Sequence, residues 1–370
     1  LIRILKQVEA DGRLATVEEQ RKLVQYVGWG GIPQVFDYWR RDEWGPDGRE
    51  LKELLTSEEY DSARASTPNA HFTSETVVRA IWDAVGRLGF EKGRILEPSL
   101  GVGHFIGLAP QDINANSRWS GVELDSITGR IGRLLYPESD VRVEGFQDAQ
   151  MPDNFYDLAI SNVPFGNYRI HDPRYRRRFS IHDYFFVKSL DKVRPGGIVA
   201  FITSKYTMDR VDSSVRRYIG ERAELVGAIR LPNTAFKENA NTTVTTDIII
   251  LRKRLPGEAL TTGETWIETG TAADKKGQSI VLNEYFVRHP EMMLGQMELG
   301  AGQFETQTDL VPDERGLDVA LREAIAKLPA GAYQERAAVE TTAEPEIVGV
   351  APTEVKEGNY TLQENGAIAQ

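Results

Sequence analysis

The sequence contains no cysteine among its 370 residues. This absence excludes disulfide bonds, a thiol nucleophile and any zinc site that requires cysteine ligands. The sequence also has no apolar run that reaches the ~18 residues needed to cross a bilayer, so we expect no membrane association. No secretory signal is visible, which together with the missing cysteine predicts a reducing, cytoplasmic location.

An excess of basic charge is absent as well. Lysine and arginine total 44 against 55 aspartates and glutamates, which gives a formal net charge of −11. A protein that coats nucleic acid non-specifically carries charge of the opposite sign. Because the total averages over all faces, a local basic groove remains compatible with it. His171 and His182 stand apart from other ligand types, so we expect no metal site.

Hydrophobic periodicity divides the chain into parts. Residues 1–69 are predicted to form a helical extension, with a loop over DYWRRDEWGPDG. Between residues 70 and 255, short apolar runs alternate with helical stretches. These runs are RILEPS, WSGVELD, VRVEGF, YDLAISN, GGIVAFITS, LVGAIRL and TDIIILRKR. They predict an α/β domain whose sheet is mostly parallel and covered on both faces.

The remaining sequence is less regular. Residues 256–335 are predicted to be a small helical extension, which includes the amphipathic stretch GLDVALREAIAKLPA. Residues 336–370 are rich in alanine, threonine, glutamate and proline, which indicates a linker. The linker leads to the start of a following domain, where an Asn365–Gly366 hairpin turn is expected. The first residue is Leu1, so we expect a fragment of a longer protein.

A turn with two glycines follows the first apolar run, in ILEPSLGVGHF. Gly101 and Gly103 would let the backbone approach a ligand closely, as in other nucleotide-binding strand–turn–helix units. Glu123 ends the next predicted strand, where a carboxylate can accept hydrogen bonds from both ribose hydroxyls of an adenosine group. Glu97 precedes the glycines, where its charge would repel a pyrophosphate and attract an ammonium group.

A ligand with adenosine at one end and an amino acid at the other satisfies both constraints, so S-adenosylmethionine is the expected cofactor. An ordinary strand-end turn with a surface carboxylate at Glu97 is the alternative. Phe146 could stack on the adenine and Asp148 could accept a hydrogen bond from its amine. A core aromatic residue and a turn aspartate are equally compatible with these two positions.

The fourth apolar run stops at Asn162, and Val163, Pro164, Phe165 and Gly166 follow. These residues could form a simple turn, or a small site that grips a planar amine. Four motifs in order resemble those of the gamma-type amino-methyltransferases, which methylate adenine N6 in DNA: HFTSE (71–75), EPSLGVGHF (97–105), GVELD (121–125) and SNVPFG (161–166).

The resemblance covers about residues 70–255. It implies a Rossmann-like class I S-adenosylmethionine-dependent methyltransferase with a seven-stranded, mostly parallel sheet. Flanking stretches such as YVGWGGIPQVFD, SIHDYFF and GAIRLPNTAF resemble the methylase portion of methylase–helicase proteins carried by phages and plasmids, some of which are described as antirestriction proteins. This implies DNA as the partner, a helicase-like domain after this chain, and a bacterial host cell. The oligomeric state stays open.

In that family, the asparagine side chain and the next backbone carbonyl accept the two N–H groups of the amine. The resemblance assigns these roles to Asn162 and Val163, followed by Pro164, and it stacks Phe165 on a base flipped out of the duplex. Valine replaces the usual proline; it still supplies a carbonyl but lacks a fixed φ angle. The cofactor residues within the motifs are Thr73, Glu97, Pro98, Gly101, Gly103, Phe105 and Glu123. Phe146 and Asp148, at the end of the third apolar run, complete the expected set.

A basic segment follows the tetrapeptide. Its arginines alternate with Tyr168 and Tyr175, which suits phosphate contact and base stacking; they are Arg169, Arg174, Arg176, Arg177 and Arg178. A solvated charged face is the alternative. The resemblance places Phe236 as a second aromatic residue against the flipped base, whereas a residue that covers the core is the other interpretation. Methylation of RNA or of a protein amide, and a non-catalytic module that assists a helicase, remain rival functions.

Overall fold

The computed structural model describes residues 1–37, 41–67, 73–166, 168–236, 244–261, 263–301, 306–335, 361–362 and 368–369. Residues 41–43, 301, 306–307 and the last four are described by their backbone alone. Residues 1–335 form one compact unit and residues 336–370 a second. The second unit pairs β12 (Thr361–Leu362) with β13 (Ile368–Ala369), and the expected Asn365–Gly366 turn lies outside the described residues.

A seven-stranded sheet forms the centre of the first unit. Its strands are β1 (Arg94–Glu97), β2 (Arg118–Glu123), β3 (Asp140–Val143), β4 (Tyr156–Asn162), β5 (Val193–Ser204), β6 (Ala223–Leu231) and β7 (Thr246–Lys253). They follow the order β3-β2-β1-β4-β5-β7-β6. Only β7 runs against its two neighbours, and the other pairs are parallel.

This arrangement confirms the predicted α/β class and the mostly parallel seven-stranded sheet of a Rossmann-like class I methyltransferase fold. The parallel strands carry continuous apolar runs because helices cover both faces. The carboxyl ends of adjacent parallel strands meet at one edge of a sheet, where open α/β folds bind ligands. Glu97, Glu123 and Asn162 are the last residues of β1, β2 and β4, so the sheet brings them to the same edge.

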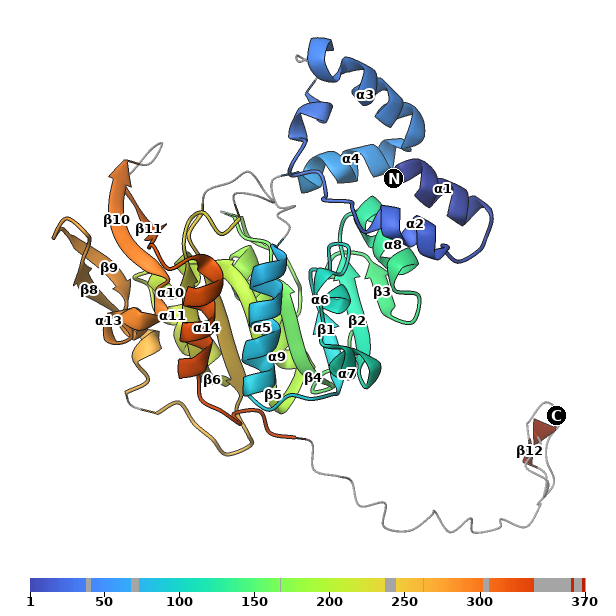
Figure 1. Cartoon of the computed structure of the whole chain (residues 1–370). Coiled ribbons are helices and arrows are strands. Elements are labelled where there is room, and N and C mark those ends of the chain that lie inside the picture. The colour runs from blue at the N-terminus through green and yellow to red at the C-terminus, as the bar shows by residue number, and fades with distance from the viewer. Residues whose placement is uncertain are drawn as a thin grey trace. The chain divides into compact units, whose positions relative to one another are not determined.

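Helices flank this sheet (Figure 1). They are α5 (Glu75–Arg87), α6 (His104–Gly107), α7 (Gln111–Ala115), α8 (Ser126–Leu135), α9 (Ile181–Lys192), α10 (Tyr206–Asp209), α11 (Ser214–Gly220) and α14 (Leu317–Lys327). Helices α5 and α14 lie side by side on one face of the sheet, in contact with each other. Within the described residues, no helix combines the length and apolarity that crossing a bilayer requires.

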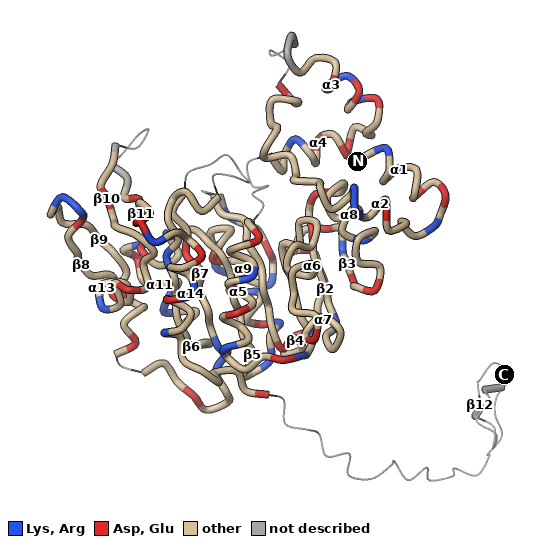
Figure 2. Tube along the Cα trace, viewed as in Figure 1, with Lys and Arg blue, Asp and Glu red and all other residues tan. Residues whose placement is uncertain are grey.

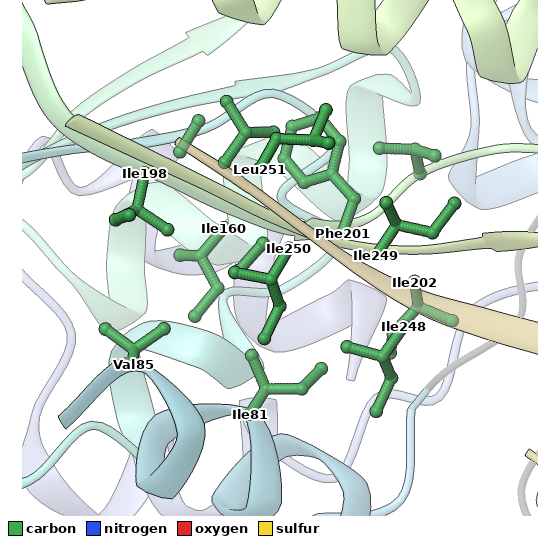
Figure 3. Packing of buried hydrophobic residues seen from close by; sticks show 14 of the residues in the cluster. Ile81, Val85, Ile160, Ile198, Phe201, Ile202, Ile248, Ile249, Ile250 and Leu251 are labelled. Atoms are coloured by element: carbon green, nitrogen blue, oxygen red, sulfur yellow. The ribbon is translucent and has the colours of Figure 1, made fainter. Parts of the chain in front are cut away.

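The main core lies between the sheet and these helices. Ile248 and Ile250 of β7 point toward Ile81 of α5 in Figure 3. Phe201 of β5 points to the opposite face, where its ring centroid lies 5.1 Å from that of Phe186 in α9. Alternate residues of one strand therefore serve both layers, which is why each central strand is apolar throughout.

The N-terminal extension is helical, as expected. It contains α1 (Ile2–Ala10), α2 (Val17–Leu23), η1 (Pro33–Phe36), α3 (Arg41–Leu54) and α4 (Ser57–Ser66). The loop expected over residues 37–48 was wrong from Arg41 onward, because α3 includes Pro46. A proline excludes only one backbone donor, and here the helix continues through it.

The extension is joined to the sheet domain by packing and by ion pairs. Its core shares Val102, Ile127 and Ile131 with the sheet domain. Glu59 of α4, which also completes a capping box with Thr56, receives Lys6 from α1 and Arg130 from α8. One buried carboxylate thus links three helices, a geometry that is costly to break once formed.

The segment after Arg254 corrects the expectation of a purely helical extension. Two antiparallel hairpins stand there, β8 (Thr269–Ala273) with β9 (Ser279–Asn283) and β10 (Gly295–Ala301) with β11 (Thr306–Pro312). Short helical elements accompany them: η2 (Thr265–Ile267), α13 (Glu284–Arg288) and η3 (Pro290–Met292). The strands are short and only weakly apolar, so they gain their stability from packing that local periodicity does not reveal.

Candidate functional site

A cavity of about 410 Å³ opens at the carboxyl edge of the sheet. Many of the residues singled out in the sequence line it: Thr73, Glu97, Pro98, Gly101, Phe105, Glu123, Phe146, Asn162, Val163, Pro164 and Phe165. Its volume falls within the usual range for a small-molecule site. The cofactor motifs and the tetrapeptide, which lie far apart in sequence, therefore share one cavity.

Glu97 gives this cavity a buried carboxyl group. The residue is 1% exposed, and its Oε2 has no hydrogen-bond partner among the residues that the structure describes. Burial, and then the nearby charge of Glu123, raise the pKa of Glu97 well above its ordinary value. An unpaired buried carboxylate is costly, so this position fits a ligand that brings a positive charge.

Glu123 holds the glycine turn in place. One carboxylate oxygen accepts a 2.8 Å hydrogen bond from the backbone N–H of Gly101, and the other accepts a 2.8 Å bond from that of Asp125. Burial raises the pKa of Glu123 to about 7, although these backbone bonds favour its ionised form. The carboxylate therefore links the ends of β1 and β2 on the wall of the cavity.

Gly103 does not line the cavity but packs against another part of the protein. It has φ +85° and precedes α6 directly. A Cβ atom at this position would lie 2.5 Å from Cε2 of Tyr136. The sequence predicted a glycine at a close approach, but the structure shows that the approaching group is a tyrosine ring of the protein itself.

The tetrapeptide begins where β4 ends. The amide Nδ2 of Asn162 donates a 3.0 Å hydrogen bond to Oγ1 of Thr73, which fixes the plane of the asparagine amide. The backbone N–H of Val163 donates a 3.1 Å bond to the carbonyl of Ile202 in β5. Val163 is buried, whereas Pro164 and Phe165 are half-buried in the cavity wall.

The structure corrects one of the two positions expected at the adenine, Phe146 and Asp148. Phe146 lines the cavity and packs against Phe185, with 5.1 Å between ring centroids. Asp148 is exposed and does not line the cavity, because a turn that closes onto the carbonyl of Gly145 directs it outward. Its Oδ2 accepts a 2.8 Å bond from Gln147, and Gln147 is the residue that lines the cavity. The expectation that Asp148 lies in the site is therefore corrected.

Sequence reasoning missed the contribution of the N-terminal extension. Ser62, Ala65 and Ser66 of α4 line the cavity together with Leu124 and Thr128 of the sheet domain. Only a spacing of three to four residues, which places small side chains on one helix face, hinted at this role. The helical extension is therefore part of the cavity wall.

The arginines of this segment differ in their contacts. Arg169, Arg176, Arg177 and Arg178 are exposed. Arg177 is bound to Ser214, and Arg174 is bound to Asp172 by a 2.9 Å ion pair. Elsewhere along the chain, basic and acidic positions are interspersed (Figure 2), so this run of arginines is a local feature. The run lies beside the cavity, because Tyr168 and Ile170 of the same segment line the cavity.

Phe236 belongs to the core. It is almost fully buried, is part of the main hydrophobic cluster and does not line the cavity. The expectation that it stacks against a flipped base is corrected to the second interpretation, an aromatic residue that covers the core. After Phe236, the next residue that the structure describes is residue 244.

No family model matches this sequence. The chain is 29% identical over 210 residues to the "Defense against restriction protein B" of Escherichia phage P1, a match that covers 55% of this chain and 9% of that protein. This chain thus spans less than a tenth of the length of that relative.

Solved structures also resemble the chain. One is a class I S-adenosylmethionine-dependent methyltransferase from Listeria monocytogenes, described as putative in its own name, with 18% identity, a TM-score of 0.44, and coverage of 52% of this chain and 63% of that one. Another is the type I restriction-modification methyltransferase subunit from Streptococcus thermophilus, with 20% identity, a TM-score of 0.43, and coverage of 50% and 44%.

Proposed function

We propose that this chain transfers a methyl group from S-adenosylmethionine to the N6 amine of adenine in DNA. The observation that carries the proposal is the shared cavity. It joins a buried carboxyl group at Glu97, a second carboxylate at Glu123, and the tetrapeptide that begins at Asn162. An acceptor for an ammonium group, an acceptor for ribose hydroxyls and a site for a planar amine thus lie in one space.

The residues fit the cofactor at both of its ends. Glu97 has an unpartnered buried oxygen within the described part of the chain, which suits the ammonium of the methionine half. Glu123 ends β2, the position from which a carboxylate accepts ribose hydroxyls. Phe146 supplies an aromatic wall for the adenine ring. S-adenosylmethionine, when bound, supplies a methyl group on a positively charged sulfur.

In this proposal the tetrapeptide prepares the target amine. Oδ1 of Asn162 and the carbonyl of Val163 accept its two N–H groups, and this draws the nitrogen lone pair out of conjugation with the ring. Phe165 stacks on the extruded base. The nitrogen forms the new N–C bond as the S–C bond breaks, the bonding pair stays on sulfur, and the amine releases one proton to water. The protein contributes positioning and electrostatics.

The bond between Asn162 and Thr73 supports this role because it orients the amide before the substrate arrives. Pre-organised acceptors stabilise developing charge without reorganisation during the reaction. The exposed arginines beside the cavity are suited to phosphate contacts. The similarity to a phage protein named for defence against restriction supports a DNA substrate in a bacterial host cell. The proposal includes a helicase-like part elsewhere in the protein and action in the cytoplasm.

The test is transfer of labelled methyl from S-adenosylmethionine to duplex DNA, single-stranded DNA, RNA and total protein. We expect N6-methyladenine in DNA, and loss of the label in Asn162→Ala. Asn116→Ala is the matched control because Asn116 is exposed and lies outside the cavity lining. Label in RNA or protein, and not in DNA, would show that the substrate is RNA or protein, whereas the proposed site would still stand. Unchanged transfer by Asn162→Ala would refute the site.

A non-catalytic module is the second candidate, favoured by the valine in place of proline at position 163. Methyl transfer separates the two. An enzyme labels its acceptor with the wild-type chain and loses that label in Asn162→Ala while still binding S-adenosylhomocysteine, whereas a non-catalytic module gives no label with the wild-type chain.

A further inference from the structure

Asp172 is a buried carboxylate in the middle of the arginine segment, and the mechanism above gives it no role. Its side chain is only 2% exposed. It receives three side chains: Arg174 Nη2 at 2.9 Å, the hydroxyl of Tyr184 at 2.6 Å, and the ammonium of Lys188 at 3.6 Å. The backbone N–H of Arg174 also donates to it, at 3.0 Å. A surface charge in a solvated loop would not gather so many donors.

Two of these donors reach further, to the adenine wall of the cavity. The ammonium of Lys188 donates to the carbonyl of Phe146 and, at 3.2 Å, to that of Gln147. Arg174 Nη2 also donates to the carbonyl of Gln147, at 3.3 Å. Phe146 and Gln147 both line the cavity. Asp172 therefore orients the two cations that hold the backbone of this wall.

Burial makes the arrangement sensitive to the loss of any partner. Lys188 is completely buried, and burial lowers its pKa to about 8. Burial also opposes the ionisation of Asp172, but the hydrogen bonds from Arg174 and Tyr184 outweigh it and lower the pKa of Asp172 below its ordinary value. A buried lysine and aspartate that share these neighbours lose stabilising partners when any member of the set is removed.

We propose that Asp172 is a positioning residue that braces two ligand sites at once, the adenine wall of the cofactor cavity and the arginine segment for nucleic acid. Arg174 then serves as a tie between them rather than as a phosphate contact. The exposed Arg169, Arg176 and Arg178 remain for the phosphates. This inference rests on the proposed function, because it assigns the adenine end of the cofactor to the wall at Phe146 and Gln147.

Arg174→Ala is the first test because the side chain of Arg174 is 47% exposed, so its removal should leave the fold intact. We expect the dissociation constant for S-adenosylhomocysteine, measured by calorimetry, to rise about fivefold or more. In steady-state transfer the KM for S-adenosylmethionine should rise while kcat stays unchanged. Arg176→Ala is the matched control. It removes a neighbouring exposed arginine whose side chain makes no hydrogen bond or ion pair to another described residue, and it should leave the affinity for S-adenosylhomocysteine unchanged.

A second measurement does not depend on any ligand. Amide hydrogen exchange of residues 145–149 in the ligand-free protein should become faster in Arg174→Ala and in Asp172→Asn, but not in Arg176→Ala. If the wild-type chain fails to bind S-adenosylhomocysteine while exchange changes as expected, the proposed function fails and the brace remains. If both variants bind S-adenosylhomocysteine and exchange like the wild type, the brace is refuted.

Discussion

The backbone N–H of Val163 donates a 3.1 Å hydrogen bond to the carbonyl of Ile202. This bond extends the pairing of β4 with β5 by one residue beyond Asn162, the last residue of β4. Proline has no N–H and cannot form it. The valine at this position is thus built into the sheet, while its carbonyl remains the group that the proposed reaction uses.

Replacement of Val163 by proline should therefore lower stability more than activity. We expect the free energy of unfolding to fall by about 1–3 kcal/mol, because the buried carbonyl of Ile202 loses its donor. Urea denaturation gives this value, and Val163→Ala, which keeps the N–H, separates the bond from side-chain packing. Methyl transfer at a temperature where both proteins are folded should persist. A Val163→Pro protein as stable as the wild type would contradict the role of this bond.

Binding of the cofactor product should depend on pH through Glu97. The folded, ligand-free protein raises the pKa of this carboxyl group, and a bound ammonium would lower it again. Binding below the raised pKa must then release a proton, so affinity for S-adenosylhomocysteine should increase as pH rises towards that raised pKa. Calorimetry should show weaker binding with less pH dependence in Glu97→Gln. The exposed Glu91 offers the control Glu91→Gln, which should retain the wild-type profile.

The carboxyl group of Glu97 should lower the stability of the folded protein when no ligand is present. Because its folded pKa lies above its unfolded value, the folded protein binds the proton more tightly, and stability is lost as pH rises from the unfolded towards the folded pKa. Glu97→Gln cannot ionise, so its ligand-free form should be more stable than the wild type at pH 8, by about 1 kcal/mol or more. Little difference is expected at pH 4. Equal melting temperatures at pH 8 would mean that Glu97 is paired in solution.

Gly103 and Gly12 form a natural pair for testing the close approach behind the cavity. Both have positive φ angles, +85° and +59°. A Cβ at Gly103 would meet Tyr136 at 2.5 Å, whereas nothing lies within 4 Å at Gly12. Gly12→Ala should cost about 1 kcal/mol from backbone strain alone, and Gly103→Ala about 1–3 kcal/mol more from overpacking. If thermal denaturation showed similar losses of stability for the two variants, the ring of Tyr136 would have to move away freely.

The sequence predicted the sheet and the main cavity residues for a common reason. Continuous apolar runs are distinctive of strands that helices cover on both faces. The glycine turn, Glu123 and the tetrapeptide each lie at the end of such a run, and parallel strands deliver their carboxyl ends to one edge. Glu97, Glu123 and Asn162 could therefore be brought together from chain order alone.

The errors arose where side-chain direction or distant packing decides the outcome. Asp148 and Gln147 differ by one position, and only the turn at Gly145 determines which of them faces the cavity. Phe236 follows a strand end like the other site residues, yet it is packed into the core. The hairpins after Arg254 have little local signal, since strand preference depends on the surface against which a strand packs.

The wall contributed by α4 leads to the last prediction. Ser62 is half-buried, lines the cavity and belongs to a helix that Glu59 ties to Lys6 and Arg130. Because this helix is fixed by a partly buried ion-pair cluster, a larger side chain at Ser62 should fill the cavity rather than displace the helix. Ser62→Leu should therefore weaken binding of S-adenosylhomocysteine at least about tenfold, which corresponds to about 1.4 kcal/mol. Asp61→Leu adds the same side chain at an exposed position of α4 outside the lining and should bind as the wild type does. Equal affinity in the two variants would show that α4 does not border the bound ligand.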